Sequence, residues 1–319
     1  MVNSEPVPTT KQQLSRIRHR HLNCFLEIAR TRKISAAAVA LNISQPAASK
    51  TLAELEEILE TKLFARRGKG GLRLTPAGRI FQRFAGSSVA ALKEGIDGLA
   101  QAKLQRGPVL VVGALLGVAA QFMPRAVKEF QEAHGMTVRI ITGPNKSMLN
   151  QLRIGEMDLV VGRLASPKEM QGLSFTHLYS EPLVFVGRPG HPLAGEAPVD
   201  LTMLEHLTLI MPTGDGLMRP VIDRFMLAHG VGLLTNTIEA RSSEFCRQYL
   251  RDTDAVWMVS LGAVQHDIED GVLCRLNVDT TETHGAVGLT VRSNRNPAPA
   301  LQLMMDTITR VAAEFPHPH

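Results

Sequence analysis

The sequence lacks the features that mark several classes of protein. No apolar run approaches the roughly 18 residues needed to cross a bilayer, and residues 1–10 are polar and contain no apolar signal core. There is no GxSxG motif, no HExxH pair and no nucleotide-binding fingerprint. We therefore expect a cytoplasmic protein that is not an enzyme, with a short disordered tail over residues 1–18.

Cysteine is scarce, and its three positions follow no known spacing. Cys24, Cys246 and Cys274 form neither a CxxC motif nor a zinc-type pattern, which excludes a disulfide framework and a structural metal site. Redox sensing by Cys246 and Cys274 is an alternative, but nothing nearby lowers a thiol pKa, so packing explains both. The eleven histidines are scattered, and we expect no metal or other cofactor.

The charge is distributed unevenly along the chain. Through Leu104 there are 17 Lys and Arg against 8 Asp and Glu, a net +9, whereas the remainder carries 18 against 22, a net −4. A basic N-terminal third joined to a mildly acidic remainder is expected if only the first part touches polyanions. A solvated basic face is the less informative alternative.

The residues from Ser35 to Lys50 predict two short helices joined by a tight turn. Ser35 is a candidate N-cap for the first helix, Asn42 and Ile43 make the turn, and Ser44 caps the second. The second helix has Pro46 in its first turn and continues with leucines at helical spacing. A helix-turn-helix places the start of its second helix in the DNA major groove, whereas the alternative is an ordinary helical hairpin.

The segments on either side extend this arrangement. His21 to Thr31 predicts a helix that packs beneath the pair, and Arg66 to Leu74 has three glycines between basic arms, typical of a β-hairpin wing that reaches DNA. A glycine-rich nucleotide loop is the rival reading, but it lacks Walker spacing.

Thr75-Pro76 begins a long helix with a heptad seam suited to pairing between two chains. We expect dimerisation through the residues of this seam, which advance by four and three: Ala85, Val89, Leu92, Ile96 and Leu99.

The chain changes character after Arg106-Gly107-Pro108. Short apolar runs such as Val109 to Leu115 alternate with amphipathic helices, which predicts parallel sheets with helices on both faces. A second set of such elements begins near Pro182. Two α/β lobes joined by crossing strands leave a cleft for a small ligand at strand ends and helix N-termini.

Together these segments resemble the LysR-type transcriptional regulators over nearly the whole chain. The most specific part is Leu22 to Gly78, with the following motifs: Leu26-Glu-Ile-Ala, a triplet of alanines, Ser44-Gln45-Pro46, Leu55-Glu56, Leu63-Phe64, Arg66 and Leu74-Thr75-Pro76-Ala77-Gly78. Within the family the sequence is most similar to regulators of aromatic-acid catabolism, particularly of the protocatechuate branch of the β-ketoadipate pathway.

The resemblance implies an α+β protein with a winged helix-turn-helix, a linker helix and a two-lobed effector domain like the periplasmic binding proteins. It implies a homodimer or homotetramer that binds and bends promoter DNA, meets RNA polymerase and responds to a small inducer. The DNA contacts that it implies are Ser44, Gln45, Pro46, Ala47, Ser49, Lys50, Arg66, Arg67 and Lys69. The predicted domains are 1–18 (tail), 19–74 (DNA binding), 75–105 (linker) and 107–319 (effector; lobe I 107–181 and 287–319, lobe II 182–286).

The resemblance also places the inducer between the two lobes. At Leu116 and Gly117 many family members carry Ser or Thr for a ligand carboxylate, whereas this sequence has no hydroxyl there, so only backbone amides remain. Arg163 matches a position where some aromatic-acid regulators use arginine, and a structural salt bridge is the equal alternative. The predicted effector contacts are Leu116, Gly117, Asn145, Lys146, Ser147, Arg163, Thr213, Ser243 and Phe245.

Two functions from different classes follow. The favoured one is an inducer-responsive regulator that binds DNA. The alternative is a cytoplasmic small-molecule-binding or enzymatic α/β protein whose N-terminal module serves dimerisation only. Strong, salt-dependent and sequence-selective binding to duplex DNA distinguishes the first from the second.

Overall fold

The computed structural model describes residues 10–66, 71–104, 109–232, 234–293 and 296–315. The chain divides into two compact units, one made of residues 1–106 with 153–156 and the other of 107–152 with 157–319. Among the described residues, no helix combines the length and the apolar character needed to cross a membrane.

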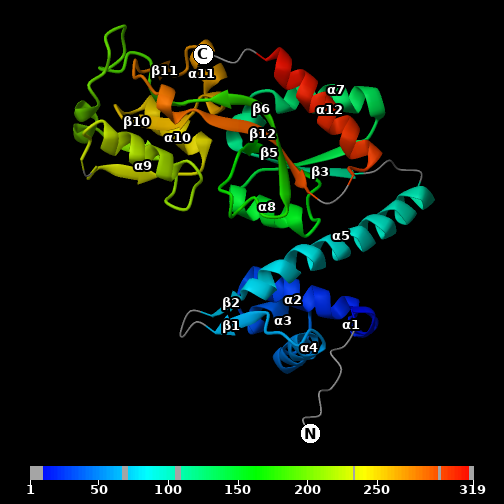
Figure 1. The fold of residues 1–319 in the computed structure, drawn as a ribbon. Coiled ribbons are helices and arrows are strands. Elements are labelled where there is room, and N and C mark those ends of the chain that lie inside the picture. The colour runs from blue at the N-terminus through cyan, green and yellow to red at the C-terminus, as the bar shows by residue number, and fades with distance from the viewer. Residues whose placement is uncertain (1–9, 67–70, 105–108, 233, 294–295, 316–319) are drawn as a thin grey trace. The chain divides into compact units, whose positions relative to one another are not determined.

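The smaller unit is helical with one two-stranded sheet (Figure 1). Its elements are α1 (Thr10–Arg16), α2 (His19–Thr31), α3 (Ile34–Ala40), α4 (Gln45–Ile58), β1 (Phe64–Arg66), β2 (Leu72–Leu74) and α5 (Pro76–Leu104). Helix α1 lies where a disordered tail was predicted, so that prediction was wrong for Thr10–Arg16.

Aromatic and small side chains together make the core of this unit. Phe25 of α2 lies at the centre, with ring centroids 5.4 Å from Phe64 and 5.1 Å from Phe81. Ala37 and Ala48 are fully buried where α3 and α4 face α2. Small side chains let the three helices approach closely, which is the packing reason for the alanine-rich run.

The turn between α3 and α4 has the conformation that its residues favour. Asn42 adopts a left-handed φ of 53°, which asparagine tolerates better than most residues, and the Ile43 N–H donates to the carbonyl of Ala38. The start of α3 differs from the prediction. Lys33, not Ser35, is the N-cap, and Ser35 lies inside the first turn.

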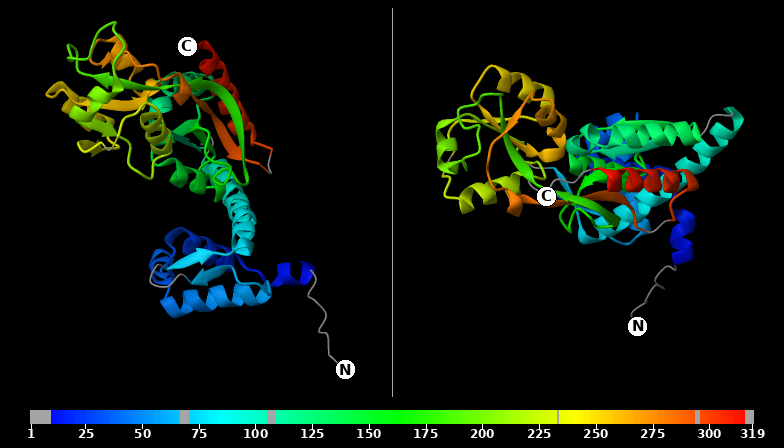
Figure 2. Two further views of the ribbon diagram at one scale, coloured as in Figure 1. Left: turned by 60° about the vertical axis from the view of Figure 1, so that its left-hand side comes forward. Right: turned by 90° about the horizontal axis from the view of Figure 1, so that it is seen from above.

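The larger unit contains two five-stranded mixed sheets, which Figure 2 shows from two further directions. The first has the order β4-β3-β5-β12-β6 and the second the order β11-β7-β10-β8-β9. The strands are β3 (Val109–Ala114), β4 (Thr137–Ile141), β5 (Leu159–Arg163), β6 (Leu173–Glu181), β7 (Leu183–Gly187), β8 (Leu209–Met211), β9 (Thr237–Glu239), β10 (Val256–Ser260), β11 (Cys274–Arg275) and β12 (Gly285–Arg292).

We call the first sheet with its helices lobe I and the second lobe II. Only part of each sheet is parallel, as in β3 with β4 and β5, so the expectation of parallel sheets was incomplete. Strand β12 returns late in the chain and runs antiparallel to both β5 and β6 (Figure 1). The lobes are therefore joined where β6 passes into β7 and again where the chain returns to β12.

Helices cover these sheets. They are α6 (Leu116–Ala120), α7 (Met123–His134), α8 (Asn145–Arg153), α9 (Arg219–Ala228), α10 (Ser243–Arg251), α11 (Gln265–Glu269) and α12 (Pro299–Glu314), with 3-10 turns η2 (Leu201–His206), η3 (Leu261–Ala263) and η4 (Thr281–Thr283). In lobe I, α7 and α12 lie side by side (Figures 1 and 2) and bury Phe130 and Ile308 in one core with β3 and β5. The mixture of helices and sheets confirms the predicted α+β class.

Candidate functional site

The start of α4 is held by a side-chain cap. The Ser44 hydroxyl oxygen accepts a hydrogen bond from the Ala47 N–H at 3.3 Å. Pro46, which has no N–H, occupies the first turn, where an N–H would have no intrahelical acceptor in any case. The remaining N–H groups of the first turn give this end a partial positive charge that favours phosphate.

The two faces of α4 differ sharply. Ala48, Leu52 and Leu55 are buried in the core. The residues that the sequence predicted as DNA contacts on this helix and its cap are all exposed: Ser44, Gln45, Pro46, Ala47, Ser49 and Lys50. The fold thus gathers a polar, weakly basic surface of short side chains around one helix N-terminus, a shape that can approach base edges.

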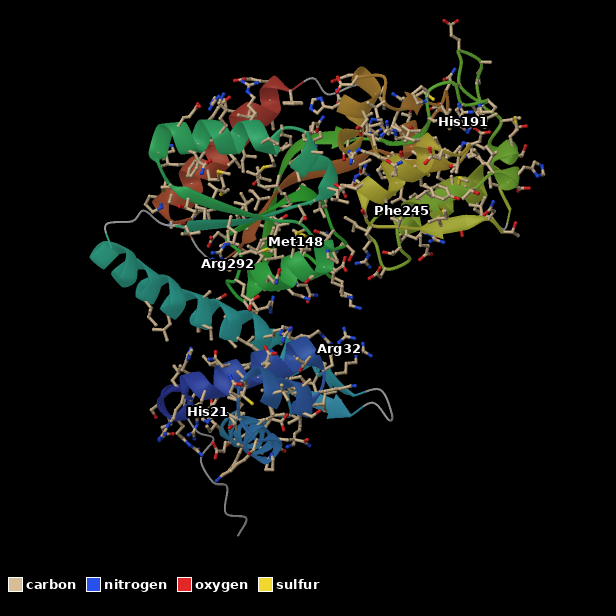
Figure 3. All side chains as sticks on the ribbon, turned by 180° about the vertical axis from the view of Figure 1, so that it is seen from behind. His21, Arg32, Met148, His191, Phe245 and Arg292 are labelled. Atoms are coloured by element: carbon tan, nitrogen blue, oxygen red, sulfur yellow. The ribbon has the colours of Figure 1, made fainter. Side chains whose placement is uncertain are left out.

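The hairpin after α4 matches the predicted wing in its backbone. Phe64 pairs with Leu74, and Arg66 pairs with Leu72 in an antiparallel ladder. The Leu72 N–H also donates to the Arg32 carbonyl at 2.9 Å, which ties the hairpin to the turn between α2 and α3 (Figure 3 labels Arg32). The predicted contacts Arg67 and Lys69 lie outside the described residues, as does the side chain of Arg66.

Glu56 explains the Leu55-Glu56 motif. Its buried carboxylate accepts the backbone N–H of Leu63 at 2.8 Å and that of Phe64 at 3.3 Å, and its other oxygen pairs with the exposed Lys62. The charge at the end of α4 therefore sets where the first strand of the hairpin begins.

A second polar link joins α2 to α4, and sequence reasoning missed it. His21 is only 3% exposed, and its Nε2 lies 3.3 Å from the carboxylate of Glu54, which also pairs with Arg20 at 3.1 Å (His21 is labelled in Figure 3). The hydrogen bond from His21, with smaller contributions from Arg20 and Lys50, lowers the pKa of Glu54. No spacing rule connects residues 33 positions apart in the chain, so the sequence carries no signal for this pair.

The predicted dimer seam on α5 divides into two parts. Ala85 is buried and Val89 half-buried in the core of the smaller unit, so these two positions serve the chain's own packing, contrary to the prediction. Leu92 and Ile96 are 50% and 57% exposed and stay available to a partner. The side chain of Leu99 lies outside the described residues.

In lobe I, α6 packs against η3 of lobe II. Leu116 is exposed, but Gly117 is buried, and a Cβ there would lie 3.4 Å from Glu181 Oε1 and 3.6 Å from the Ala263 nitrogen. Protein atoms of both lobes thus lie on the side of Gly117 where a side chain would point. The expectation that its backbone amide meets a ligand stays a prediction.

Arg163 is buried at the end of β5. Its Nη2 donates to the Glu181 carbonyl at 2.7 Å and its Nη1 to the Thr283 carbonyl at 3.3 Å, while its Nε lies 3.8 Å from the Glu181 carboxylate without a hydrogen bond. Burial lowers the pKa of the guanidinium and raises that of the Glu181 carboxyl. Of the two predicted roles, these contacts support the structural one.

The other predicted effector positions lie in three helix-start loops. Asn145, Lys146 and Ser147 form the first turn of α8, just before the buried Met148 (Figure 3), and Lys146 is exposed. Thr213 donates to Asp215 at 2.8 Å and accepts from Arg241 at 2.9 Å. Arg241, a half-exposed cation, was not among the predicted residues.

The last two predicted effector residues lie at the start of α10. Ser242, not Ser243, caps this helix by accepting the Phe245 N–H at 3.2 Å, and Ser243 is buried. Phe245 remains exposed (Figure 3) and stacks on Tyr249. Ser243 is therefore a packing residue, whereas Phe245 presents an aromatic surface.

The chain matches two family models. Residues 19–79 match the bacterial regulatory helix-turn-helix protein, lysR family, and residues 104–313 match the LysR substrate binding domain. These matches agree with the helix-turn-helix and the two-lobed unit described above.

Individual relatives are regulators as well. The chain is 44% identical to the HTH-type transcriptional regulator PcaQ of Agrobacterium fabrum, over 94% of this chain and 96% of that protein. It is 33% identical to the uncharacterized HTH-type transcriptional regulator YdcI of Escherichia coli, over 92% and 96% of the two chains.

Solved structures share the fold. A Corynebacterium glutamicum OxyR C206 mutant has 25% identity and a TM-score of 0.55 over 98% of this chain and 94% of that one. Full-length CbnR in complex with its target DNA has 18% identity and a TM-score of 0.53 over 92% of this chain and 100% of that chain. The family models and the relatives show that this chain belongs to the LysR family of bacterial transcriptional regulators and not to a family of enzymes.

Proposed function

We propose that this protein reads an operator through α4 and the wing, as a dimer or a dimer of dimers. We further propose that a small carboxylated inducer, of the kind met in aromatic-acid catabolism, changes its binding to a promoter and the bend in the DNA. Binding to chromosomal DNA in a bacterium implies a cytoplasmic location. The observation that carries the proposal is the exposed face of α4, where Gln45, Ser49 and Lys50 surround a capped helix N-terminus.

The proposed contacts divide by chemistry. Gln45 carries an amide that can donate to and accept from a base edge, so it is the candidate for sequence readout. Lys50 and Arg66 carry positive charges suited to phosphates, and phosphate contacts position the protein without reading sequence. A single short helix offers few contacts, so two half-sites read by two subunits are expected.

Three observations support an anionic, planar inducer. Lys146 is exposed in the first turn of α8, Arg241 is half-exposed in lobe II although it pairs with Asp215, and Phe245 presents a ring at the start of α10. Cations hold carboxylates, and an aromatic ring suits a flat, unsaturated body. The 44% identity to PcaQ over nearly the full length supports protocatechuate and the intermediates of its catabolic pathway as first compounds to test.

The test is binding to the DNA upstream of the gene and its divergent neighbour, measured by footprinting across a salt series with and without these compounds. A short inverted repeat, protected with a steep salt dependence, is the expected result. A footprint altered by one compound identifies the inducer. Specific binding that no compound alters would refute the aromatic-acid assignment, and the absence of any specific binding would refute the DNA-reading function itself.

A further inference from the structure

The two lobes meet at a point where backbone faces backbone. Gly117 in α6 and Gly262 in η3 lie opposite each other, and a Cβ on Gly262 would lie 3.3 Å from the Gly117 carbonyl oxygen. The same Cβ would lie 2.7 Å from Glu181 Oε2 and 3.0 Å from Gln121 Oε1. Neither glycine has a positive φ. At Gly262 the close approach of the lobes, and not backbone conformation, therefore favours a residue without a side chain, whereas a Cβ on Gly117 would lie no closer than 3.4 Å to any atom.

Two hydrogen bonds cross the same junction. Glu181 at the end of β6 in lobe I accepts the Gly262 N–H of lobe II at 3.1 Å. Gln121, which follows α6 in lobe I, donates to Gln265 of lobe II at 2.8 Å. The Tyr179 hydroxyl donates to the Gln121 oxygen at 3.1 Å, which orients that amide so that its nitrogen points at Gln265.

The position of Glu181 is costly unless these contacts are made. The residue is 5% exposed, and its carboxylate is stabilised by the Gly262 N–H, a Ser260 hydroxyl and the Arg163 guanidinium. A buried carboxylate that loses a hydrogen-bond donor bears a large desolvation penalty. Moving the lobes apart by about 1 Å would remove the Gly262 donor, because hydrogen bonds weaken steeply beyond their normal length.

The connections between the lobes are pinned at the same place. The Leu183 N–H at the start of β7 donates to the Thr283 hydroxyl at 2.8 Å, and Arg163 bonds the carbonyls of Glu181 and Thr283. Both segments that join the lobes are thus tied to one another directly beside the glycine contact. The angle between the lobes therefore depends mainly on the hydrogen bonds of this junction, and only little on the flexibility of the two connecting segments.

We propose that Gly117, Gly262, Glu181, Gln121 and Gln265 form a latch that holds the two lobes at one spacing in the absence of inducer. The latch breaks as a unit, because the Glu181 and Gln121 hydrogen bonds need the same close approach of the two glycines. Its link to DNA binding rests on the function proposed above, since an inducer that changes the lobe angle must break or re-form these bonds.

The experiment compares Gly262→Ala with Gly232→Ala in the full-length, DNA-free and inducer-free protein. Gly232 also lies in lobe II, is exposed, has no positive φ, and its Cβ would meet only the end of the Glu205 side chain at 3.4 Å. Amide hydrogen exchange is measured by mass spectrometry over residues 116–121 and 259–265. Gly262→Ala should exchange roughly tenfold faster in both segments, while Gly232→Ala matches the wild type.

Two further variants keep the test decisive if Gly262→Ala does not fold. Gln265→Ala removes one crossing bond from a half-exposed side chain and should accelerate exchange in the same two segments. Glu181→Gln keeps an acceptor for the Gly262 N–H and should leave the exchange of that amide unchanged. Wild-type exchange in both segments of Gly262→Ala, or of Gln265→Ala where the glycine variant is unfolded, would overturn the latch. DNA footprinting of the same samples tests the proposed function separately, so the two failures are distinguishable.

Discussion

The carboxylate of Glu56 offers the most direct test of how the DNA-binding unit is held together. In Glu56→Ala, the backbone N–H groups of Leu63 and Phe64 lose their side-chain acceptor. Leu63 is almost completely buried, so its N–H cannot easily turn to water. An unsatisfied buried donor costs about 1–3 kcal/mol, and an acceptor that carries a charge raises the cost.

The magnitude follows from these contacts. One fully lost and one partly lost hydrogen bond give a loss of about 2–4 kcal/mol in the opening free energy of the hairpin and the end of α4. The ion pair with Lys62 adds little, because the lysine is largely exposed. Since about 1.4 kcal/mol corresponds to a factor of ten, hydrogen exchange over residues 56–66 should accelerate by about 30- to 900-fold.

The adjacent Glu57 provides a matched control. It lies on the same helix but is exposed, so Glu57→Ala should change the same exchange rates by less than about threefold, within about 0.5 kcal/mol. Thermal unfolding of both variants checks that the effector domain is unaffected. If Glu56→Ala exchanged no faster than Glu57→Ala, the carboxylate would not be what positions the hairpin, and the reasoning would be refuted.

Further predictions follow from other residues. Gln45→Ala should relax sequence preference at one operator position by about 1–3 kcal/mol. Arg66→Ala should instead weaken binding to all sequences and reduce the slope of log K against log salt concentration by about one. Competition binding with mutated operators separates the two effects, and equal behaviour of both variants would contradict the assignment. Leu92→Asp should dissociate the oligomer at micromolar concentration in analytical ultracentrifugation, because a half-exposed apolar position would then place a charge in the interface; an unchanged mass would exclude this face of α5. Burial raises the pKa of the Glu181 carboxyl, so the folded chain binds a proton at Glu181 more tightly than the unfolded chain does. This tighter binding stabilises the folded state at low pH, and the stabilisation is lost as the pH rises through the folded-state pKa of Glu181. Relative to Glu181→Gln, the wild type should therefore lose thermal stability as the pH is raised from the ordinary carboxyl range toward neutrality, and parallel pH profiles would count against a strained carboxyl.

Local sequence patterns predicted most of the secondary structure. The helix predicted from His21 to Thr31 is α2 (His19–Thr31), and the apolar run from Val109 to Leu115 forms β3 (Val109–Ala114). Their apolar residues recur with the period of the helix or strand that they form, so the local conformational preference of these segments agrees with the observed secondary structure. Strands β6 and β8 were missed, because β6 is an edge strand with an irregular register and β8 has only three residues.

Side-chain roles were harder to predict than elements. Ala85 and Val89 continue the heptad seam of Leu92 and Ile96 in sequence, and periodicity gives no reason to separate them. Only the packing of α5 against α2 shows that the first two positions are covered by the chain's own core. In the same way, a serine before a helix is a cap or a packing residue depending on one residue of register, as Ser242 and Ser243 show.

By itself the sequence determined the helix-turn-helix, because capping, turn and spacing preferences act over a few residues. It also determined the basic character of the N-terminal third, and its motifs resembled those of a known regulator family. The tertiary structure alone decided which polar groups meet. Glu181 and Gly262 are 81 positions apart, and Gln121 and Gln265 are 144 apart. Such pairs depend on the path of the whole chain through two mixed sheets. Local preferences act over a few residues and therefore do not determine the distance between the two lobes.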